Sequence, residues 1–225
     1  MLQWQEKNPV DDFGLYVVMT NPELGYRRFT EICVEEEVPI IQLRDKSMPN
    51  LDLVLLAKEL KGITSNTNTH FFVNDRVDHA ILADADGVHL GPQDVSWQEA
   101  RRLLPKQKLI GVSTHSIAEA ELLIRQISEP GNPKAPDYMS FGPIYPTVAK
   151  KIPDPPVGTE QLARIMVIAP LPVVAIGGLF PHNISEVFQA GARNIAMIRH
   201  LGDSVCPGEL REKIQQLRQI IRSKK

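Results

Sequence analysis

The segment PVVAIGG (172–178) is a short apolar run that ends in two glycines. A strand that faces water on one side alternates apolar and polar residues, whereas a parallel strand covered by helices is apolar on both faces. The segment FFV (71–73) has the same unbroken apolar pattern. Both segments therefore predict strands of a parallel sheet that is buried on both faces.

Similar apolar segments recur at intervals of about 20–30 residues, with stretches of helical spacing between them. Eight such units without a change of composition favour a closed (β/α)8 TIM barrel over an open doubly wound sheet. We therefore predict a single-domain α/β barrel at residues 13–222, preceded by an N-terminal extension at residues 1–12. The predicted strands are LYVVMT (15–20), PIIQLR (39–44), HFFVND (70–75), GVHLG (87–91), LIGVST (109–114), YMSFGP (138–143), PVVAIGG (172–178) and NIAMIR (194–199).

Helix start signals support the alternation of strands and helices. Ser96, Ser116 and Asn183 each stand three residues before a glutamate, which is the spacing of a capping box. These residues are expected to cap the first turn of the helix that follows each of them. The predicted helices span residues 51–61, 96–104, 116–127, 159–168, 183–190 and 209–221.

Charge and composition exclude several classes of protein. The 225 residues include 25 basic and 27 acidic side chains, so the net charge of -2 provides no overall positive field for nucleic acid or an anionic membrane. The chain shows no signal-peptide pattern and no run of ~18–20 apolar residues. Cys33 and Cys206 have neither CxxC nor metal-ligand spacing, so we expect both to be reduced. The expectation is a soluble cytoplasmic protein with small-molecule partners.

Polar residues follow six of the eight predicted strands. Chemistry in a barrel of this kind gathers at the carboxyl ends of the strands. The strand period of two places Gln42 and Arg44 opposite the apolar Ile41, so both point into the barrel mouth if Ile41 packs against helices. A guanidinium there needs an anionic partner, which is either a ligand or one of the carboxylates Asp45 and Asp75.

Two aspartates, Asp75 and Asp94, follow the third and fourth predicted strands. Adjacent strands would bring their carboxylates together as a hard-oxygen site, and Mg²⁺ takes one or two carboxylates and completes its shell with substrate phosphate. The alternative is that each aspartate is a turn or helix-capping residue. His89 of the fourth strand is either a ligand contact or a core histidine with satisfied hydrogen bonds.

The later strands add hydroxyl and cationic donors to the same rim. Ser113, Thr147 and Lys150 follow the fifth and sixth strands, and the proline-rich segment 143–158 is longer than the usual 2–6-residue βα turn. We therefore predict that segment 143–158 is an active-site loop, with a tolerated surface insertion as the alternative. The pattern GxSxG is absent, which argues against Ser113 as a covalent nucleophile.

The glycines Gly177 and Gly178 close the seventh predicted strand. Without a Cβ atom their backbone N–H groups can approach a ligand, and the loops after strands seven and eight commonly bind phosphate in such barrels. Together with the cations Arg44, Lys46 and Lys150, they predict a site for phosphorylated or diphosphorylated small molecules and Mg²⁺.

Six motifs, in this order along one barrel, resemble the thiamine-phosphate synthase family over residues 13–202. The resemblance implies that 4-amino-2-methyl-5-(diphosphooxymethyl)pyrimidine is joined to a thiazole phosphate, giving thiamine phosphate and pyrophosphate. The implied chemistry is dissociative, with the C–O bond breaking before the thiazole nitrogen attacks. The motifs are QLRDK (42–46), NDR (74–76), DGVHLGPQD (86–94), GVSTH (111–115), FGPIYPTVAK (141–150) and VVAIGG (173–178).

The resemblance also implies a role for each matching residue. It implies pyrophosphate contacts from Arg44, Lys46, Asn74, Ser113 and Lys150, Mg²⁺ ligands at Asp75 and Asp94, pyrimidine contacts from Gln42 and His89, and thiazole phosphate contacts from Thr147 and Gly178.

Three positions depart from the family pattern. Ala149 stands where members usually carry a second threonine, and Pro92-Gln93 replaces the usual Gln-acid pair before Asp94. Arg199 stands where a small residue usually follows the eighth strand. We predict that the Arg199 guanidinium binds the thiazole phosphate in place of the lost donors, with an outward orientation as the alternative.

Two other functions compete with the synthase. Thiazole tautomerases share the barrel and the GxSxH segment, where the histidine matching His115 moves a proton, but they generally lack the QLRxK cations and the paired aspartates. A non-catalytic regulatory barrel that binds phosphorylated thiazole is the other alternative, motivated by Ala149 and Arg199. The cations and aspartates present in this chain favour the synthase.

Overall fold

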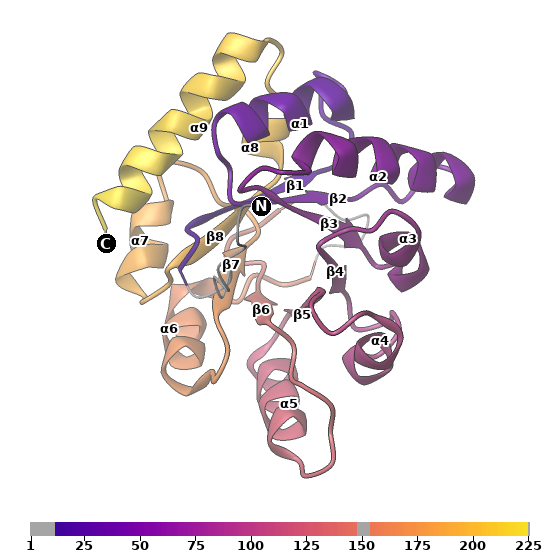
Figure 1. The fold of residues 1–225 in the computed structure, drawn as a ribbon. Coiled ribbons are helices and arrows are strands. Elements are labelled where there is room, and N and C mark those ends of the chain that lie inside the picture. The colour runs from indigo at the N-terminus through magenta and orange to yellow at the C-terminus, as the bar shows by residue number, and fades with distance from the viewer. Residues whose placement is uncertain (1–11, 148–153, 225) are drawn as a thin grey trace.

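Eight parallel strands close into a barrel in the computed structural model, which describes residues 12–147 and 154–224. Each strand pairs with the next along the chain, and β8 returns to pair with β1. Figure 1 shows the helices as an outer ring around the strands. The predicted (β/α)8 barrel is confirmed. The strands are β1 (Leu15–Met19), β2 (Ile40–Leu43), β3 (His70–Asn74), β4 (Gly87–Leu90), β5 (Leu109–Thr114), β6 (Tyr138–Phe141), β7 (Val173–Ile176) and β8 (Asn194–Met197).

Every predicted helix is present, and α1, α3 and α8 have no counterpart among the predicted ranges. α8 has only four residues, which is too short for a helical period to show in the sequence. None of the helices in residues 12–147 and 154–224 is long and apolar enough to cross a membrane. The helices are α1 (Tyr26–Glu35), α2 (Asn50–Thr64), α3 (Val77–Leu82), α4 (Trp97–Leu103), α5 (Ile117–Ser128), α6 (Gly158–Ile168), α7 (Ile184–Gln189), α8 (Arg199–Gly202) and α9 (Pro207–Arg222).

The eighth strand and the chain ends differ in detail from the prediction. β8 ends at Met197 rather than at residue 199, because Ile198 leaves the extended region with φ -119° and ψ -89° and Arg199 opens α8. The described elements run from Leu15 to Arg222, while residues 1–11 of the predicted extension lie outside the described part of the chain. Cys33 is buried and Cys206 is exposed, and both are free thiols as expected.

Two of the three predicted helix caps are confirmed. Ser96 accepts a hydrogen bond from the Glu99 N–H at 3.3 Å, and Ser116 accepts one from the Glu119 N–H at 3.2 Å. The predicted cap at Asn183 is wrong. The Asn183 side chain instead accepts from the N–H of Phe180 and donates to the carbonyl of Gly178, so its hydrogen bonds hold the turn before α7.

The barrel has an outer core between strands and helices and an inner core inside the strands. Alternate residues of each strand serve the two cores: in β1, Val17 faces the helices while Tyr16 and Val18 face the barrel axis. Both faces are buried, which is why the strands are apolar throughout. The inner core consists of Tyr16, Val18, Ile40, Phe72, Leu109, Tyr138, Val174 and Ala196.

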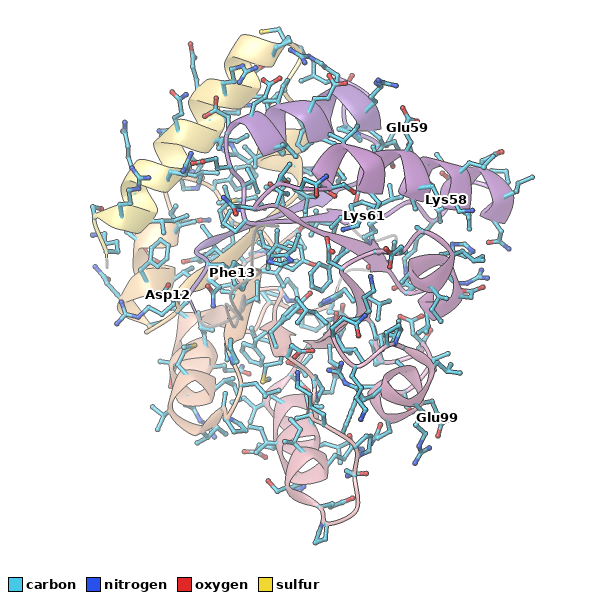
Figure 2. All side chains as sticks on the ribbon, viewed as in Figure 1. Asp12, Phe13, Lys58, Glu59, Lys61 and Glu99 are labelled. Atoms are coloured by element: carbon cyan, nitrogen blue, oxygen red, sulfur yellow. The ribbon has the colours of Figure 1, made fainter. Side chains whose placement is uncertain are left out.

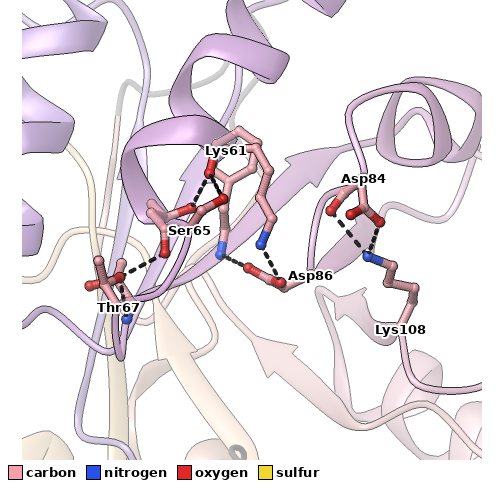
Figure 3. A network of polar contacts seen from close by, with 9 residues as sticks. Lys61, Ser65, Thr67, Asp84, Asp86 and Lys108 are labelled. Atoms are coloured by element: carbon pink, nitrogen blue, oxygen red, sulfur yellow. Dashed lines mark hydrogen bonds and ion pairs between the residues drawn. The ribbon is translucent and has the colours of Figure 1, made fainter. Parts of the chain in front are cut away.

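An aspartate before β4 fastens β3, β4 and α2 together at the end where the strands begin. Asp86 accepts a hydrogen bond from the N–H of Phe71 at 2.8 Å, and Lys61 of α2 pairs with its other oxygen at 2.6 Å (Figure 3). Figure 2 labels Lys61 together with Lys58 and Glu59 on α2, and of these three only Lys61 is partly buried. The Lys61 side chain therefore connects α2 to the sheet.

Asp137 repeats this arrangement two strands further along. It accepts a hydrogen bond from the N–H of Ile110 at 2.8 Å and pairs with Arg101 of α4 at 2.6 Å. The side chains of Asp137 and Arg101 are each only 5% exposed. Removing one partner of so buried a pair leaves the other charge without compensation, which is strongly destabilising.

We expect Asp137→Ala to lower the free energy of unfolding by about 3–5 kcal/mol, because the buried Arg101 loses its only carboxylate among the described residues and the Ile110 N–H loses its acceptor. Glu59→Ala is the control, since Glu59 pairs with an Arg27 side chain that is 68% exposed and should leave stability nearly unchanged. Urea unfolding followed by circular dichroism measures both variants. Equal decreases in the free energy of unfolding of the two variants would show that the buried pair stabilises the fold no more than the exposed pair does.

Candidate active site

A cavity of about 680 Å³ opens at the carboxyl ends of the strands. The strand register brings residues from distant parts of the chain to one rim, as the sequence predicted. Lys150, a further predicted site residue, lies outside the described residues. The predicted site residues that line the cavity are Gln42, Arg44, Lys46, Asn74, Asp75, His89, Asp94, Ser113, Thr147 and Gly177.

A second, smaller cavity of about 230 Å³ adjoins the first. Gly178 and the exposed Arg199 line only this second cavity, while Thr147 and Gly177 line both. The residues for which the sequence predicts contacts to a thiazole phosphate are therefore gathered around one hollow. It lies beside the loops that follow β7 and β8, where barrels of this fold frequently bind phosphate.

The two glycines after β7 also hold the start of the predicted active-site loop. Gly177 and Gly178 have φ of +96° and +68°, which L-residues with a Cβ rarely adopt. A Cβ on Gly178 would lie 2.7 Å from the carbonyl oxygen of Tyr145. Tyr145 donates its N–H to the Gly177 carbonyl at 3.1 Å, so the chain after β6 continues to pair with the chain after β7. The glycines serve this close packing as well as the cavity.

The carboxylates of Asp75 and Asp94 lie together, as predicted. Lys46 pairs with Asp75 at 3.1 Å, and Asp94 accepts a hydrogen bond from the Gly91 N–H at 2.6 Å. Burial raises the pKa of Asp94 to about 6 against the opposing Gly91 hydrogen bond, and the hydrogen bond and charge of Asp75 add to the rise. The alternative that Asp94 is a turn residue thus holds for the oxygen that accepts the Gly91 hydrogen bond. The Asp94 carboxyl group also faces the carboxyl group of Asp75.

This donor set fits a magnesium ion. Within the described residues there is no group of three or more His, Cys, Asp or Glu side chains that could enclose a metal alone. Mg²⁺ does not need such a cage, because it commonly takes one or two carboxylates and fills its other positions with water and phosphate oxygens. Asp75 and Asp94 provide two adjacent carboxylates, and Lys46 is the cation paired with Asp75. The two carboxylates can therefore accept further positive charge from a metal ion.

Arg44 has no carboxylate partner in the described part of the chain, contrary to the alternative that it pairs with Asp45 or Asp75. Its Nη1 atom lies 3.5 Å from the hydroxyl of Thr20, at the long limit of a hydrogen bond. Asp45 instead accepts hydrogen bonds from the N–H groups of Ser47 and Met48 and from a tyrosine hydroxyl. The half-buried guanidinium of Arg44 therefore remains available to an anion in the cavity.

A chain of side-chain hydrogen bonds forms the floor of the large cavity. The amide nitrogen of Gln42 donates to the Tyr16 hydroxyl at 2.8 Å, and the Tyr16 and Tyr138 hydroxyls lie 2.9 Å apart. The Tyr138 hydroxyl lies 2.8 Å from Nδ1 of His89, and Nε2 of His89 lies 2.8 Å from the Ser113 hydroxyl. Five strands each contribute one residue to this chain.

The His89 ring is buried and has both nitrogens hydrogen-bonded, so the core-histidine alternative describes it correctly, although it also lines the cavity. Burial lowers the pKa of His89 to about 4, and burial raises the pKa of Tyr16 and Tyr138 well above the usual range. All three side chains are therefore neutral near pH 7. The cavity combines charged groups at its rim with an uncharged polar floor.

Tyr16 and Tyr138 are residues of the site that were not predicted from the sequence. The available signal is that a tyrosine within a buried apolar strand must find a partner for its hydroxyl. Gly111 makes room for the Tyr138 ring, because a Cβ on Gly111 would lie 2.0 Å from Cζ of Tyr138. The glycine of the GVSTH motif thus has a packing role that its sequence position alone does not reveal.

His115 lies at the rim, next to the carboxylates of two acidic residues. Its Nδ1 atom lies 3.2 Å from Glu119, and its Nε2 atom lies 3.9 Å from Asp154. All three residues line the large cavity. Glu119 and Asp154 add acidic side chains to this part of the rim. Their contacts with His115 were not predicted from the sequence, and the geometry alone assigns the cluster no chemistry.

Comparison with known proteins identifies the family. A family model described as thiamine monophosphate synthase matches residues 15–201 of the chain. The chain belongs to this family. A thiamine-phosphate synthase of Lawsonia intracellularis is 36% identical over 214 residues, which cover 93% of each chain. One of Methanoculleus marisnigri is 38% identical over 190 residues, which cover 83% of this chain and 86% of the relative.

A solved structure agrees with these relatives. The thiamine phosphate pyrophosphorylase of Pyrococcus furiosus superposes with a TM-score of 0.79 at 31% identity, covering 94% of this chain and 96% of that one. The chain is thus an enzyme, a transferase of the thiamine-phosphate synthase type. The comparisons give no support to the tautomerase or to the non-catalytic barrel.

We expect Gly111→Ala to lower the free energy of unfolding by about 1–3 kcal/mol, because the new methyl group overlaps the Tyr138 ring. The matched control is Gly62→Ala in α2, where a Cβ meets nothing within 4 Å and better helix propensity should add up to about 1 kcal/mol. Thermal and urea unfolding of both variants provide the comparison. An unchanged or raised free energy of unfolding for Gly111→Ala would mean that Tyr138 makes room without cost.

Proposed function

We propose that the chain joins a hydroxymethylpyrimidine diphosphate to a thiazole phosphate in the large cavity, with the thiazole phosphate group in the second cavity. The observation that carries the proposal is the presence of two adjoining cavities. One has cations and a carboxylate pair on its rim, and Thr147 and Gly177 line both. Two phosphorylated substrates that react with each other need two such neighbouring sites.

Arg44, Lys46, Asn74, Ser113 and Lys150 are proposed to hold the diphosphate of the pyrimidine. The C–O bond to the pyrimidine methylene breaks and its electron pair leaves with the pyrophosphate. Hydrogen-bond donors and cations already aimed at the leaving oxygens stabilise that charge without rearrangement. The half-buried guanidinium of Arg44 is suited to this because it can donate two parallel hydrogen bonds to a phosphate.

Asp75 and Asp94 are proposed to hold Mg²⁺ as the cofactor. When bound there, the ion supplies positive charge to the oxygens of the departing diphosphate. Lys46, paired with Asp75, keeps that carboxylate at the rim.

Gln42 and His89 are proposed to flank the pyrimidine ring on the floor of the cavity. Breaking the C–O bond leaves a positive charge on the pyrimidine methylene. Because His89 and the tyrosines beneath it are uncharged near pH 7, the floor does not repel that cation.

The thiazole is proposed to lie between the two cavities, fixed by its phosphate. Thr147, Gly178 and Arg199 would bind the phosphate, so that the thiazole nitrogen points toward the pyrimidine methylene. The nitrogen lone pair then forms the new C–N bond. Holding both partners in place favours this attack over capture of the cation by water. Small molecules are thus the proposed partners, and the cytoplasm is the location we expect for this biosynthetic step.

The direct test incubates the purified protein with both substrates and Mg²⁺ and measures thiamine phosphate and pyrophosphate. We expect equal amounts of the two products. Tight binding of thiazole phosphate without turnover would favour a non-catalytic barrel, and isomerisation of a carboxythiazole phosphate without pyrophosphate would favour a tautomerase.

We expect Asp94→Asn to lower kcat at least about a hundredfold, because the amide keeps the size and the Gly91 hydrogen bond but loses the charge that holds Mg²⁺. Asp45→Asn is the matched control on the same rim. Asp45 accepts hydrogen bonds from its local turn and from the Tyr26 hydroxyl, which an asparagine oxygen can also accept, so most of the turnover should remain. Similar kcat values for the two variants would remove Asp94 from this role.

We expect Arg199→Ser to raise the KM for thiazole phosphate about tenfold or more and to leave the KM for the pyrimidine substrate unchanged, because a charged donor to the phosphate is lost. Arg193→Ser is the control, because it removes an exposed arginine whose side chain, among the described residues, bonds the carbonyl of Lys224 at 3.4 Å. An unchanged KM for thiazole phosphate in Arg199→Ser would show that Arg199 points away from the substrate.

A further inference from the structure

The hydrogen-bonded chain on the cavity floor has a direction. It begins at Gln42 of β2, passes through Tyr16 of β1, Tyr138 of β6 and His89 of β4, and ends at Ser113 of β5. An amide nitrogen can only donate a hydrogen bond, while a hydroxyl carries one proton and a neutral imidazole carries one N–H. The arrangement of protons along the chain therefore follows from its first member.

The proton positions can be assigned one link at a time. Gln42 donates to the Tyr16 oxygen, so Tyr16 uses its own proton toward Tyr138. Tyr138 then uses its proton toward Nδ1 of His89. Nδ1 is an acceptor, so the single N–H of His89 lies on Nε2 and donates to the Ser113 oxygen. The Ser113 proton remains for a ligand.

Within residues 12–147 and 154–224, the two tyrosine hydroxyls have no hydrogen-bond partner outside this chain. Tyr16 is 2% exposed and Tyr138 is fully buried, and the ring of Phe72 lies within 6.0 Å of both rings between centroids. His89 stacks on Tyr138 with the ring centroids 5.6 Å apart. A buried hydroxyl without a partner is costly, so each one is confined to the neighbours in this chain.

We infer that Gln42, acting through Tyr16, Tyr138 and His89, directs the Ser113 hydroxyl proton into the cavity as a donor to the leaving diphosphate. Tyr16, Tyr138 and His89 are positioning residues in this respect, and Ser113 is the group that touches the substrate. The inference deepens the proposed function, on which its final step rests. In the opposite direction Ser113 would donate to His89 and present only lone pairs to the anion.

The direction of the chain can be measured in the free protein. Nitrogen NMR of ¹⁵N-histidine-labelled protein distinguishes the two neutral tautomers, and the His89 signals are assigned by their loss in His89→Gln. We expect the Nε2–H tautomer in the unsubstituted protein. The Nδ1–H tautomer would overturn the inference, whatever reaction the enzyme catalyses.

Gln42→Glu should reverse the chain with little change of shape. At pH 9 a carboxylate at position 42 can only accept, so Tyr16 must donate to it and every later link must turn around. We expect His89 to change to the Nδ1–H tautomer, and retention of the Nε2–H tautomer would overturn the inference. Tyr26→Phe is the control, because it removes a tyrosine hydroxyl that bonds Asp45 outside the chain and should leave the tautomer unchanged.

Turnover tests the link to the substrate. We expect Ser113→Ala and Tyr138→Phe each to lower kcat about tenfold, as for the loss of one hydrogen bond to a charged group. The double variant should be within about twofold of Ser113→Ala alone, because Tyr138 acts through Ser113. Independent losses that multiply would overturn this link. Absence of thiamine phosphate from the unsubstituted enzyme would instead contradict the proposed function and leave the tautomer result intact.

Discussion

The constraint on which this structure depends is that a polar group inside the barrel must find its hydrogen-bond partner there. The hydroxyls of Tyr16 in β1 and Tyr138 in β6 bond each other inside the barrel, and Gln42 of β2 and His89 of β4 extend the contact to two further strands. Unpaired, each buried group would destabilise the fold. Paired, they form a fixed and uncharged floor beneath the cavity.

Charge is confined to the rim above that floor. Lys46 pairs with Asp75, Asp94 is held by the turn at Gly91, and Arg44 has only a long hydroxyl contact among the described residues. A reaction that separates a positive pyrimidine from a negative diphosphate suits this division. In the proposed function, the neutral floor tolerates the cation, while the rim compensates the anion.

Much of the fold and of the rim could be predicted, because a strand that is buried on both faces is apolar at every position. Unbroken runs such as Val173–Ile176 predicted parallel strands, and the polar residues that follow them predicted the rim. The cap predicted at Asn183 failed because a nearby turn competes for the same amide, a choice that depends on where Gly178 and Phe180 lie in space. Arg199 begins α8 rather than ending β8, because the backbone of Ile198 leaves the extended conformation.

The sequence by itself determined the barrel, the order of its strands and the kinds of side chain that meet at the rim, because periodicity and strand ends are local properties of the chain. Only the tertiary structure decided that Lys46 rather than Arg44 pairs with Asp75, and that Tyr16, Tyr138 and His89 are linked. These contacts join residues from separate strands across the closed barrel. Their partners are selected by distance in space, which the spacing of residues along one strand does not encode.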